Sequence, residues 1–369
     1  MTFFPTATPE PSQDPKKEPE GRSSEGSTTK AALRSPLAIT LGIIILLAII
    51  VYVASRVWTE VLWFDQLNAA RVLWTRWGAA AVLFLVTFAV QFAAITAVVT
   101  WAYRKRPSRL GGQSGSTLRE YQKALEPFRK AIFWGLPALI ALMTAAGMAT
   151  QWQTFMVWFN RTPFGVTDPQ FNLDIGFYVF TLPILDTILS FLLNTAVVSL
   201  LAVIIIGYLY GGISFSPRFK MTSSARMQIG ILGAVLSLIV ALRYWVGIYS
   251  LVLGTGDIVD GALYRDVHAV LPAQMILAVI SLLVAVLFLV AAFRGTWKLP
   301  AVGVAVTVVS ALVVGGAYPA LVQQFRVTPN ARQMETPYIQ RNIDATLAAY
   351  GLDEVEYQTY AAKTDVSPG

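Results

Sequence analysis

The stretch PAQMILAVISLLVAVLFLVAAF at residues 272–293 contains no charged side chain and decides the class of this protein. A helix of about 20 apolar residues crosses the hydrocarbon core of a bilayer. Inside lipid the backbone finds no water, so a helix, which satisfies its own N–H and C=O groups, is the expected form. Buried helices of soluble proteins are usually shorter and keep a polar stripe. Residues 272–293 therefore predict a transmembrane helix.

Six further stretches have the same character, at residues 36–55, 78–103, 131–151, 181–210, 226–250 and 300–322. The whole chain is 55% hydrophobic and 13% charged, with a mean hydropathy of +0.58. The sequence predicts an all-α membrane protein, a seven-helix transmembrane bundle over residues 36–322. We expect residues 1–35, rich in Pro, Ser, Thr, Glu and Lys, to be a disordered cytoplasmic tail.

The orientation follows from the basic residues between the spans, because cytoplasmic loops carry an excess of Lys and Arg. The N-terminal tail and alternate loops hold 18 Lys and Arg residues, against 5 in the opposite loops. We predict that the N-terminus lies inside and the C-terminus outside the cytoplasm.

Several function classes are disfavoured by the composition. The net charge of +7 comes from basic residues that flank the apolar stretches, so we expect membrane lipids rather than nucleic acid as partners. The absence of cysteine excludes disulfides and thiol chemistry. The sequence contains no HExxH, Walker A or GxSxG motif, so we predict no enzymatic activity and no cofactor.

The connecting segments have their own patterns. Residues 104–130 predict a short amphipathic helix on the inner membrane surface, opened by a capping box at Thr117 and Glu120. The outer loops are rich in aromatic residues, which favour the headgroup region. In the first of these loops they are Trp58, Trp63, Phe64, Trp74 and Trp77.

The segment 323–369 gains charge and contains one more predicted helix, at residues 337–350. Thr336 would be its N-cap, Pro337 its first residue and Gly351 its stop. Ile339, Ile343 and Leu347 would form one apolar face. That face needs a cover, so we expect an interface there, with the membrane, a further domain or another envelope protein.

Two charged residues fall within spans. Asp186 lies near the outer end of the fourth span, and Arg243 lies at a similar depth in the fifth. Charges in a membrane are costly and usually pair or line a wet cavity, so we predict a contact between them. We interpret it as a structural pair, with a gate or substrate contact as the alternative. Ser190 and Asn194 extend a polar stripe from Asp186, and Gln91 lies in the second span.

A metal site is a further hypothesis, because His268, the single histidine, follows Asp257, Asp260 and Asp266. Their spacing matches neither an EF-hand nor a zinc motif. Aspartate is also an ordinary loop residue, and Asp266 could cap the incoming helix. We therefore predict no metal site and keep these four residues as candidates only.

Four stretches resemble uncharacterised protein family 0182, a group of large bacterial multi-pass membrane proteins. They are VLWF (61–64) with VLWTR (72–76), FGVTDPQF (164–171) running on to FYVFTLP (177–183), YRDVHAVLP (264–272), and PN (329–330) followed by ETPYIQRNI (335–343). The resemblance implies the bacterial plasma membrane and a seven-span N-terminal part followed by a large extracytoplasmic domain. We expect residues 323–369 to be an incomplete start of that domain. The resemblance supplies no activity.

Two functions remain open. The first is a non-enzymatic anchor or assembly module of the cell envelope, favoured by the aromatic outer surface. The alternative is a transporter or lipid-handling protein that uses the polar stripe near Asp186 and Arg243. A water-filled cavity reaching the midplane would favour the second function, and a sealed bundle the first.

Overall fold

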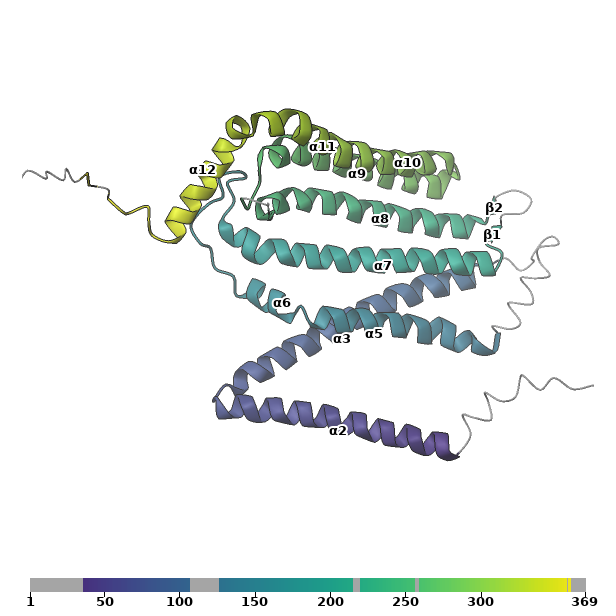
Figure 1. The fold of residues 1–369 in the computed structure, drawn as a ribbon. Coiled ribbons are helices and arrows are strands. Elements are labelled where there is room, and N and C mark those ends of the chain that lie inside the picture. Colours follow the sequence, from purple (N-terminus) through teal and green to yellow (C-terminus); the bar gives the residue numbers. More distant parts are fainter. Residues whose placement is uncertain (1–35, 107–125, 215–219, 256–258, 357, 360–369) are drawn as a thin grey trace, which may run out of the picture. The chain divides into compact units, whose positions relative to one another are not determined.

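The computed structural model describes residues 36–106, 126–214, 220–255, 259–356 and 358–359. The predicted tail at 1–35 and most of the predicted surface helix, at 107–125, lie outside these residues. The regular structure of the described chain is helical (Figure 1), apart from an isolated bridge between Thr167 and Asp174 and a two-residue antiparallel ladder that pairs Ile213 with Met221. Its strands are β1 (Ile213–Ser214) and β2 (Lys220–Met221).

Seven helical runs of the described residues are long and apolar enough to cross a membrane, which confirms the predicted number. The α-helices are α2 (Pro36–Gln66), α3 (Ala70–Arg104), α5 (Leu136–Ala149), α6 (Trp152–Phe159), α7 (Leu182–Leu209), α8 (Ser223–Ser250), α9 (Leu271–Arg294), α10 (Lys298–Leu312), α11 (Tyr318–Val322) and α12 (Ala331–Ala349). Short 3₁₀ and π segments join them: η1 (Glu126–Phe128), η2 (Ala131–Gly135), η3 (Phe177–Thr181), η4 (Leu251–Leu253), η5 (Asp266–Val270), η6 (Val313–Ala317), η7 (Gln323–Val327) and η8 (Thr328–Asn330).

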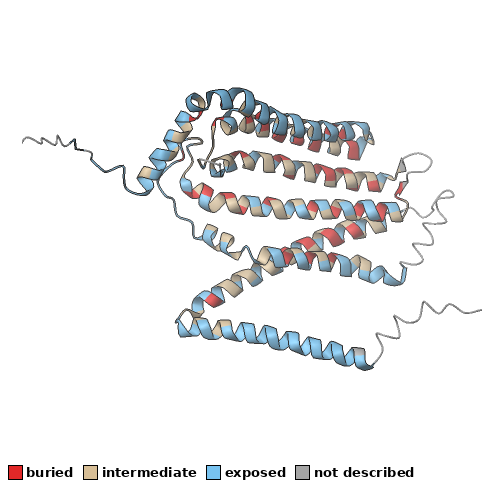
Figure 2. Ribbon diagram, viewed as in Figure 1, coloured by how far each residue is buried: buried red, intermediate tan, exposed pale blue. Residues whose placement is uncertain are grey.

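The chain divides into two compact units, residues 1–74 and 75–369. In the first unit, none of the described side chains of α2 is buried (Figure 2), although the helix is almost wholly apolar. A helix that is apolar on all sides suits a lipid environment.

In the second unit, α7, α8, α9 and α10 lie side by side in sequence order (Figure 1). The closest approach is between α8 and α9. A Cβ added at Gly230 would lie 2.5 Å from the Cβ of Ala292, and one at Gly233 would lie 2.7 Å from the ring of Phe288. Small residues at helix interfaces allow this close packing, which is typical of membrane bundles.

A second packing centre joins α3 to α7. Ile95 and Val99 of α3 and Ile206 of α7 are buried against one another, and Phe133 and Ile140 pack onto them. Gln91, which is fully buried, donates through Nε2 to Asn194 Oδ1 of α7 at 3.2 Å. The polar groups predicted along these spans therefore bond between helices.

Each π-helical segment of the described chain ends two residues before a proline. The segments are η2, η3, η5, η6 and η7, and the prolines are Pro137, Pro183, Pro272, Pro319 and Pro329. Proline has no N–H, and its ring clashes with the carbonyl four residues before it. A wider turn relieves that clash and lets the helix continue, so the prolines do not break the spans.

Two sequence predictions about the connections are wrong. The first predicted outer loop is mainly helix, because α2 runs to Gln66 and α3 begins at Ala70. All five of its aromatic residues lie in these two helices, joined by a turn in which Asn68 has a φ of 52°. The C-terminal helix begins at Ala331, and Pro337 lies inside it. Its predicted stop is confirmed: Gly351 has a φ of 64°, and Leu352 N–H donates to the Leu347 carbonyl at 2.8 Å.

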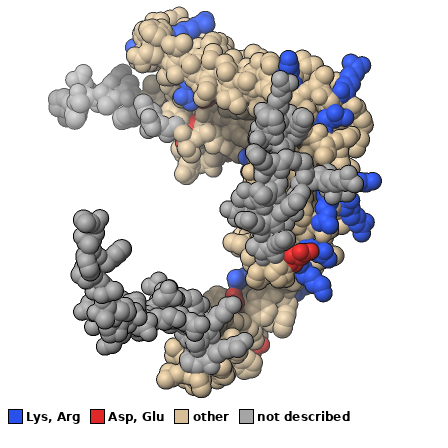
Figure 3. Space-filling view, turned by 90° about the vertical axis from the view of Figure 1, so that its right-hand side faces the viewer, with Lys and Arg blue, Asp and Glu red and all other residues tan. Residues whose placement is uncertain are grey.

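Lys and Arg side chains gather at one end of the second unit, on the face shown in Figure 3. We call this the basic end. It is the end where α3 and α9 stop and α8 and α10 start. Its described cations are Arg104, Lys105, Arg106, Arg129, Lys130, Arg226, Arg294 and Lys298. The opposite end, where α12 lies, is called the α12 end.

Candidate functional site

The loop between α6 and η3 is held by two aspartates at the α12 end. Asp168 is buried and accepts from Phe171 N–H at 2.5 Å and from the Tyr178 hydroxyl at 3.1 Å. Asp174 accepts three backbone N–H groups, at 3.1 Å from Phe164, 2.9 Å from Gly165 and 2.7 Å from Gly176. These bonds hold the pKa of the Asp174 carboxyl below its usual value, and the bond from Phe164 has the largest effect.

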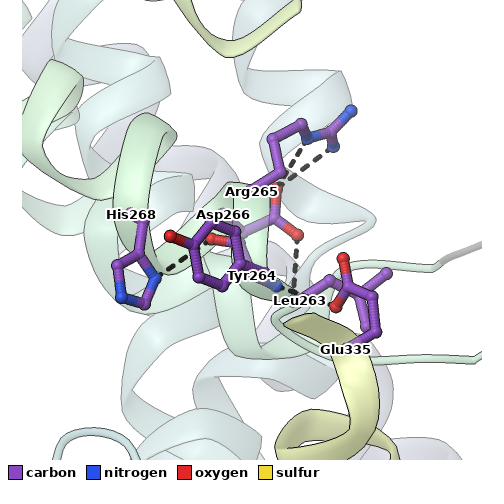
Figure 4. Close-up of polar contacts among 6 residues, drawn as sticks. All are labelled: Leu263, Tyr264, Arg265, Asp266, His268 and Glu335. Atoms are coloured by element: carbon purple, nitrogen blue, oxygen red, sulfur yellow. Dashed lines mark hydrogen bonds and ion pairs between the residues drawn. The ribbon is translucent and has the colours of Figure 1, made fainter. Parts of the chain in front are cut away.

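The segment that enters α9 forms the centre of the site (Figure 4). Asp266 accepts from Leu263 N–H at 3.1 Å and pairs with Arg265 at 3.1 Å. The ring of His268 stacks on Tyr264 with centroids 4.1 Å apart, and its Nδ1 lies 3.3 Å from the Tyr264 carbonyl. Asp266 therefore reaches back to an amide at the start of its own helical turn, as the carboxylate of a capping box does.

Glu335 of α12 reaches this segment. Its carboxylate is buried, with 9% of the residue exposed, and it accepts from Tyr264 N–H at 3.0 Å (Figure 4). A buried amide without a partner is costly, so this bond ties α12 to the entry of α9.

Three more contacts join α12 to loops of the same unit. The Tyr338 hydroxyl lies 3.3 Å from His268 Nδ1. Asn342 Nδ2 donates to the Asp260 carbonyl at 3.0 Å, and Arg341 Nη1 donates to Gln170 Oε1 at 3.1 Å. We call these three contacts, together with the bond between Tyr264 and Glu335, the α12 junction.

The α12 junction is made by polar side chains of the helix, outside the predicted apolar face. Glu335, Tyr338 and Asn342 make the contacts, whereas Ile343 is 45% exposed. The predicted interface of Ile339, Ile343 and Leu347 with the membrane, a further domain or another envelope protein stays a prediction.

The metal candidates do not converge. Asp257 lies outside the described residues. Asp260 contributes its backbone carbonyl to the α12 junction, while Asp266 and His268 make the local bonds given above. Among the described residues, no three His, Cys, Asp or Glu side chains are grouped so that they could hold a metal ion.

The structure brings Asp186 and Arg243 together. Arg243 Nη2 lies 3.4 Å from Asp186 Oδ1, and Arg243 Nη1 donates to Ser190 Oγ at 3.2 Å. The side chains are 65% exposed for Asp186 and 37% for Arg243. The pair belongs to the α12 end, and with Asn194 and Gln91 it continues a polar line into the bundle.

Sequence reasoning missed Glu335, Asp168 and Asp174 as individual residues. Each lies in a stretch that carries the family resemblance, but no spacing rule indicates which amide each carboxylate accepts. An aspartate before proline is typical of a turn, and this was the available signal for Asp168.

Residues 37–369 match the uncharacterised protein family (UPF0182). The chain belongs to this family. A UPF0182 protein of Kocuria rhizophila is 42% identical over 353 residues, which are 95% of this chain and 35% of the relative. UPF0182 proteins of Clavibacter sepedonicus and Thermobifida fusca are 40% and 39% identical, over 91% and 94% of this chain and 35% and 34% of the relatives. This chain thus spans about a third of the length of these relatives. No solved structure matches it.

We expect Glu335→Ala to loosen α12 in this UPF0182 chain, because it removes the acceptor of the Tyr264 amide. The cost of a buried unpaired amide is about 1–3 kcal/mol. Hydrogen exchange of α12 amides, read by mass spectrometry, should accelerate accordingly. Glu335→Gln keeps an acceptor oxygen and should exchange more slowly than Glu335→Ala. Glu354→Ala, at an exposed position after α12, is the control. Equal exchange in Glu335→Ala and the control would contradict the role of Glu335.

For Asp186 and Arg243 we expect a coupled effect on stability. Asp186→Asn and Arg243→Gln should each lower the melting temperature in detergent, and the double variant should recover part of the loss. The coupling should be about 0.2–1 kcal/mol, since much of the pair is exposed. Strictly additive effects would show that the contact does not contribute to stability.

Proposed function

We propose that this protein is a non-enzymatic, multi-pass membrane module that anchors an extracytoplasmic segment in a fixed orientation. The observation that carries this proposal is the buried bond from Tyr264 N–H to Glu335. Helical structure continues from Lys298 to Ala349, so the chain leaves the last span without a flexible connection. The α12 junction then fixes the direction in which the chain continues.

The proposed orientation has the basic end in the cytoplasm and the α12 end outside it, in a bacterial plasma membrane. The gathering of cations in Figure 3 supports it, because positive charge is retained on the cytoplasmic side. With this orientation the α12 junction faces the compartment in which the family resemblance expects the larger domain.

The proposed partners are membrane lipids and other envelope or membrane proteins. Large apolar side chains remain exposed at the α12 end, among them Phe159, Phe164, Val166 and Ile343. Exposed apolar groups of this kind support contacts with lipid or with a further protein surface.

The transporter or lipid-handling alternative rests on the polar line from Asp186 to Gln91. In it, Arg243 acts as a gate or substrate contact, and Arg243→Gln should abolish flux while leaving the melting temperature unchanged. Two cavities lined by described residues, of about 360 and 670 Å³, have mainly apolar linings. They favour the anchor over an aqueous pathway.

Topology can be tested by single-cysteine labelling, because the chain has no cysteine. We expect an impermeant maleimide to label Glu354→Cys in intact cells. Lys298→Cys, at the basic end, should react only after the membrane is permeabilised. The reverse pattern would overturn the proposed orientation.

The anchor itself can be tested by measuring the distance between two nitroxide labels, at Val166→Cys and Glu354→Cys. Both positions are exposed at the α12 end. We expect a narrow distance distribution that broadens when Glu335→Ala and Tyr338→Ala are introduced together. Asp344→Ala, on an exposed part of α12, should leave it narrow. A broad distribution with the α12 junction intact would contradict a fixed orientation.

A further inference from the structure

A groove runs along α3 beside η2, with a volume of about 670 Å³. Ala93 and Ala97 supply small side chains, and Phe92 and Trp134 supply large ones whose ring centroids are 6.0 Å apart. The volume lies in the about 300–1,000 Å³ range of ligand pockets. We call this feature the α3 groove.

The length of the α3 groove matches one leaflet of a bilayer. Its lining residues on α3 extend from Phe92 to Arg104 and recur at helical spacing on one face. The twelve steps from Phe92 to Arg104 rise about 18 Å at 1.5 Å per residue. Half of a hydrocarbon core of about 30 Å is about 15 Å. The α3 groove can therefore accommodate an extended acyl chain.

The mouth of the α3 groove is cationic. Arg104 and Lys105 line it at the basic end, and no carboxylate of the described residues forms an ion pair with either. The next cation, Arg106, is used differently, since its guanidinium lies 3.9 Å from the ring centroid of Tyr103. The two cations thus lie at the membrane surface, while the rest of the groove lining is mainly apolar.

Thr96 is a buried polar residue beside the α3 groove. It lines the α3 groove, only 9% of it is exposed, and its hydroxyl has no hydrogen-bond partner among the described residues. Buried polar groups are normally satisfied. Thr96 lies eight residues before Arg104, about 12 Å along the helix, and is therefore at the depth of the acyl chain.

We propose that the α3 groove binds an anionic phospholipid, with one acyl chain along α3 and the phosphate against Arg104 and Lys105. The site is distinct from the α12 junction and does not depend on the proposed anchoring role. The surrounding membrane supplies the ligand, and the charge at the mouth selects anionic over zwitterionic headgroups.

The test is native mass spectrometry of the full chain in neutral detergent, titrated with dioleoylphosphatidylglycerol or dioleoylphosphatidylcholine. We expect phosphatidylglycerol to bind about tenfold more tightly. Arg104→Gln with Lys105→Gln should abolish that preference. Arg294→Gln with Lys298→Gln removes two exposed cations of the same end outside the groove and should retain it. Equal binding of the two lipids, or an equal loss in the control pair, would overturn the proposal.

Binding of the acyl chain along α3 is tested separately by Ala97→Phe, with Ala93→Phe as a second variant. Both alanines are exposed in the α3 groove, so a larger side chain fills the groove without crowding the packed interior. We expect each to weaken phosphatidylglycerol binding several-fold at an unchanged melting temperature. Unchanged binding in both variants, or displacement of the lipid by millimolar inorganic phosphate, would show that only a headgroup is recognised and would overturn the proposed site.

Discussion

A chain inside lipid must satisfy every backbone N–H and C=O group without water, and this constraint determines the structure. It explains why the spans are helical and why the short β1–β2 ladder and the loop after α6 lie at helix ends. Where a helix starts or ends, side chains bond to the backbone groups that the helix leaves unpaired. The Thr222 hydroxyl accepts from Ala225 N–H at the start of α8, and Asp174 accepts three amides before η3.

The two ends of the second unit use charge in different ways. At the basic end, Arg106 and Arg129 lie against the ring of Tyr103, so the cations keep their charge available at the surface. At the α12 end, most of the buried or loop carboxylates accept backbone amides. A carboxylate that already holds an amide in place is a structural group, and among the metal candidates this applies to Asp266.

The sequence predicted the structure best where a single physical effect determines it. Apolar length alone predicts the spans, as residues 272–293 show, because nothing else competes with burial in lipid. Prediction failed where local and tertiary effects compete. Pro337 is typical of a helix start, yet it lies inside α12 because the preceding turns already form a continuous helix. The buried carboxylate of Glu335 was missed as a contact of α12. Its partner is a backbone amide 71 residues away, which no periodicity can indicate.

The π turns before the prolines change how the surfaces of the spans must be assigned. Each adds a residue to its turn, so side chains before it are rotated by about 100° relative to a continuous α-helix. A single helical wheel drawn across η5 and α9, or across η6 and α11, therefore places lipid-facing residues in the interior and interior residues in lipid. In this chain the prolines mark where the helical phase changes, and the two parts of such a span require separate wheels.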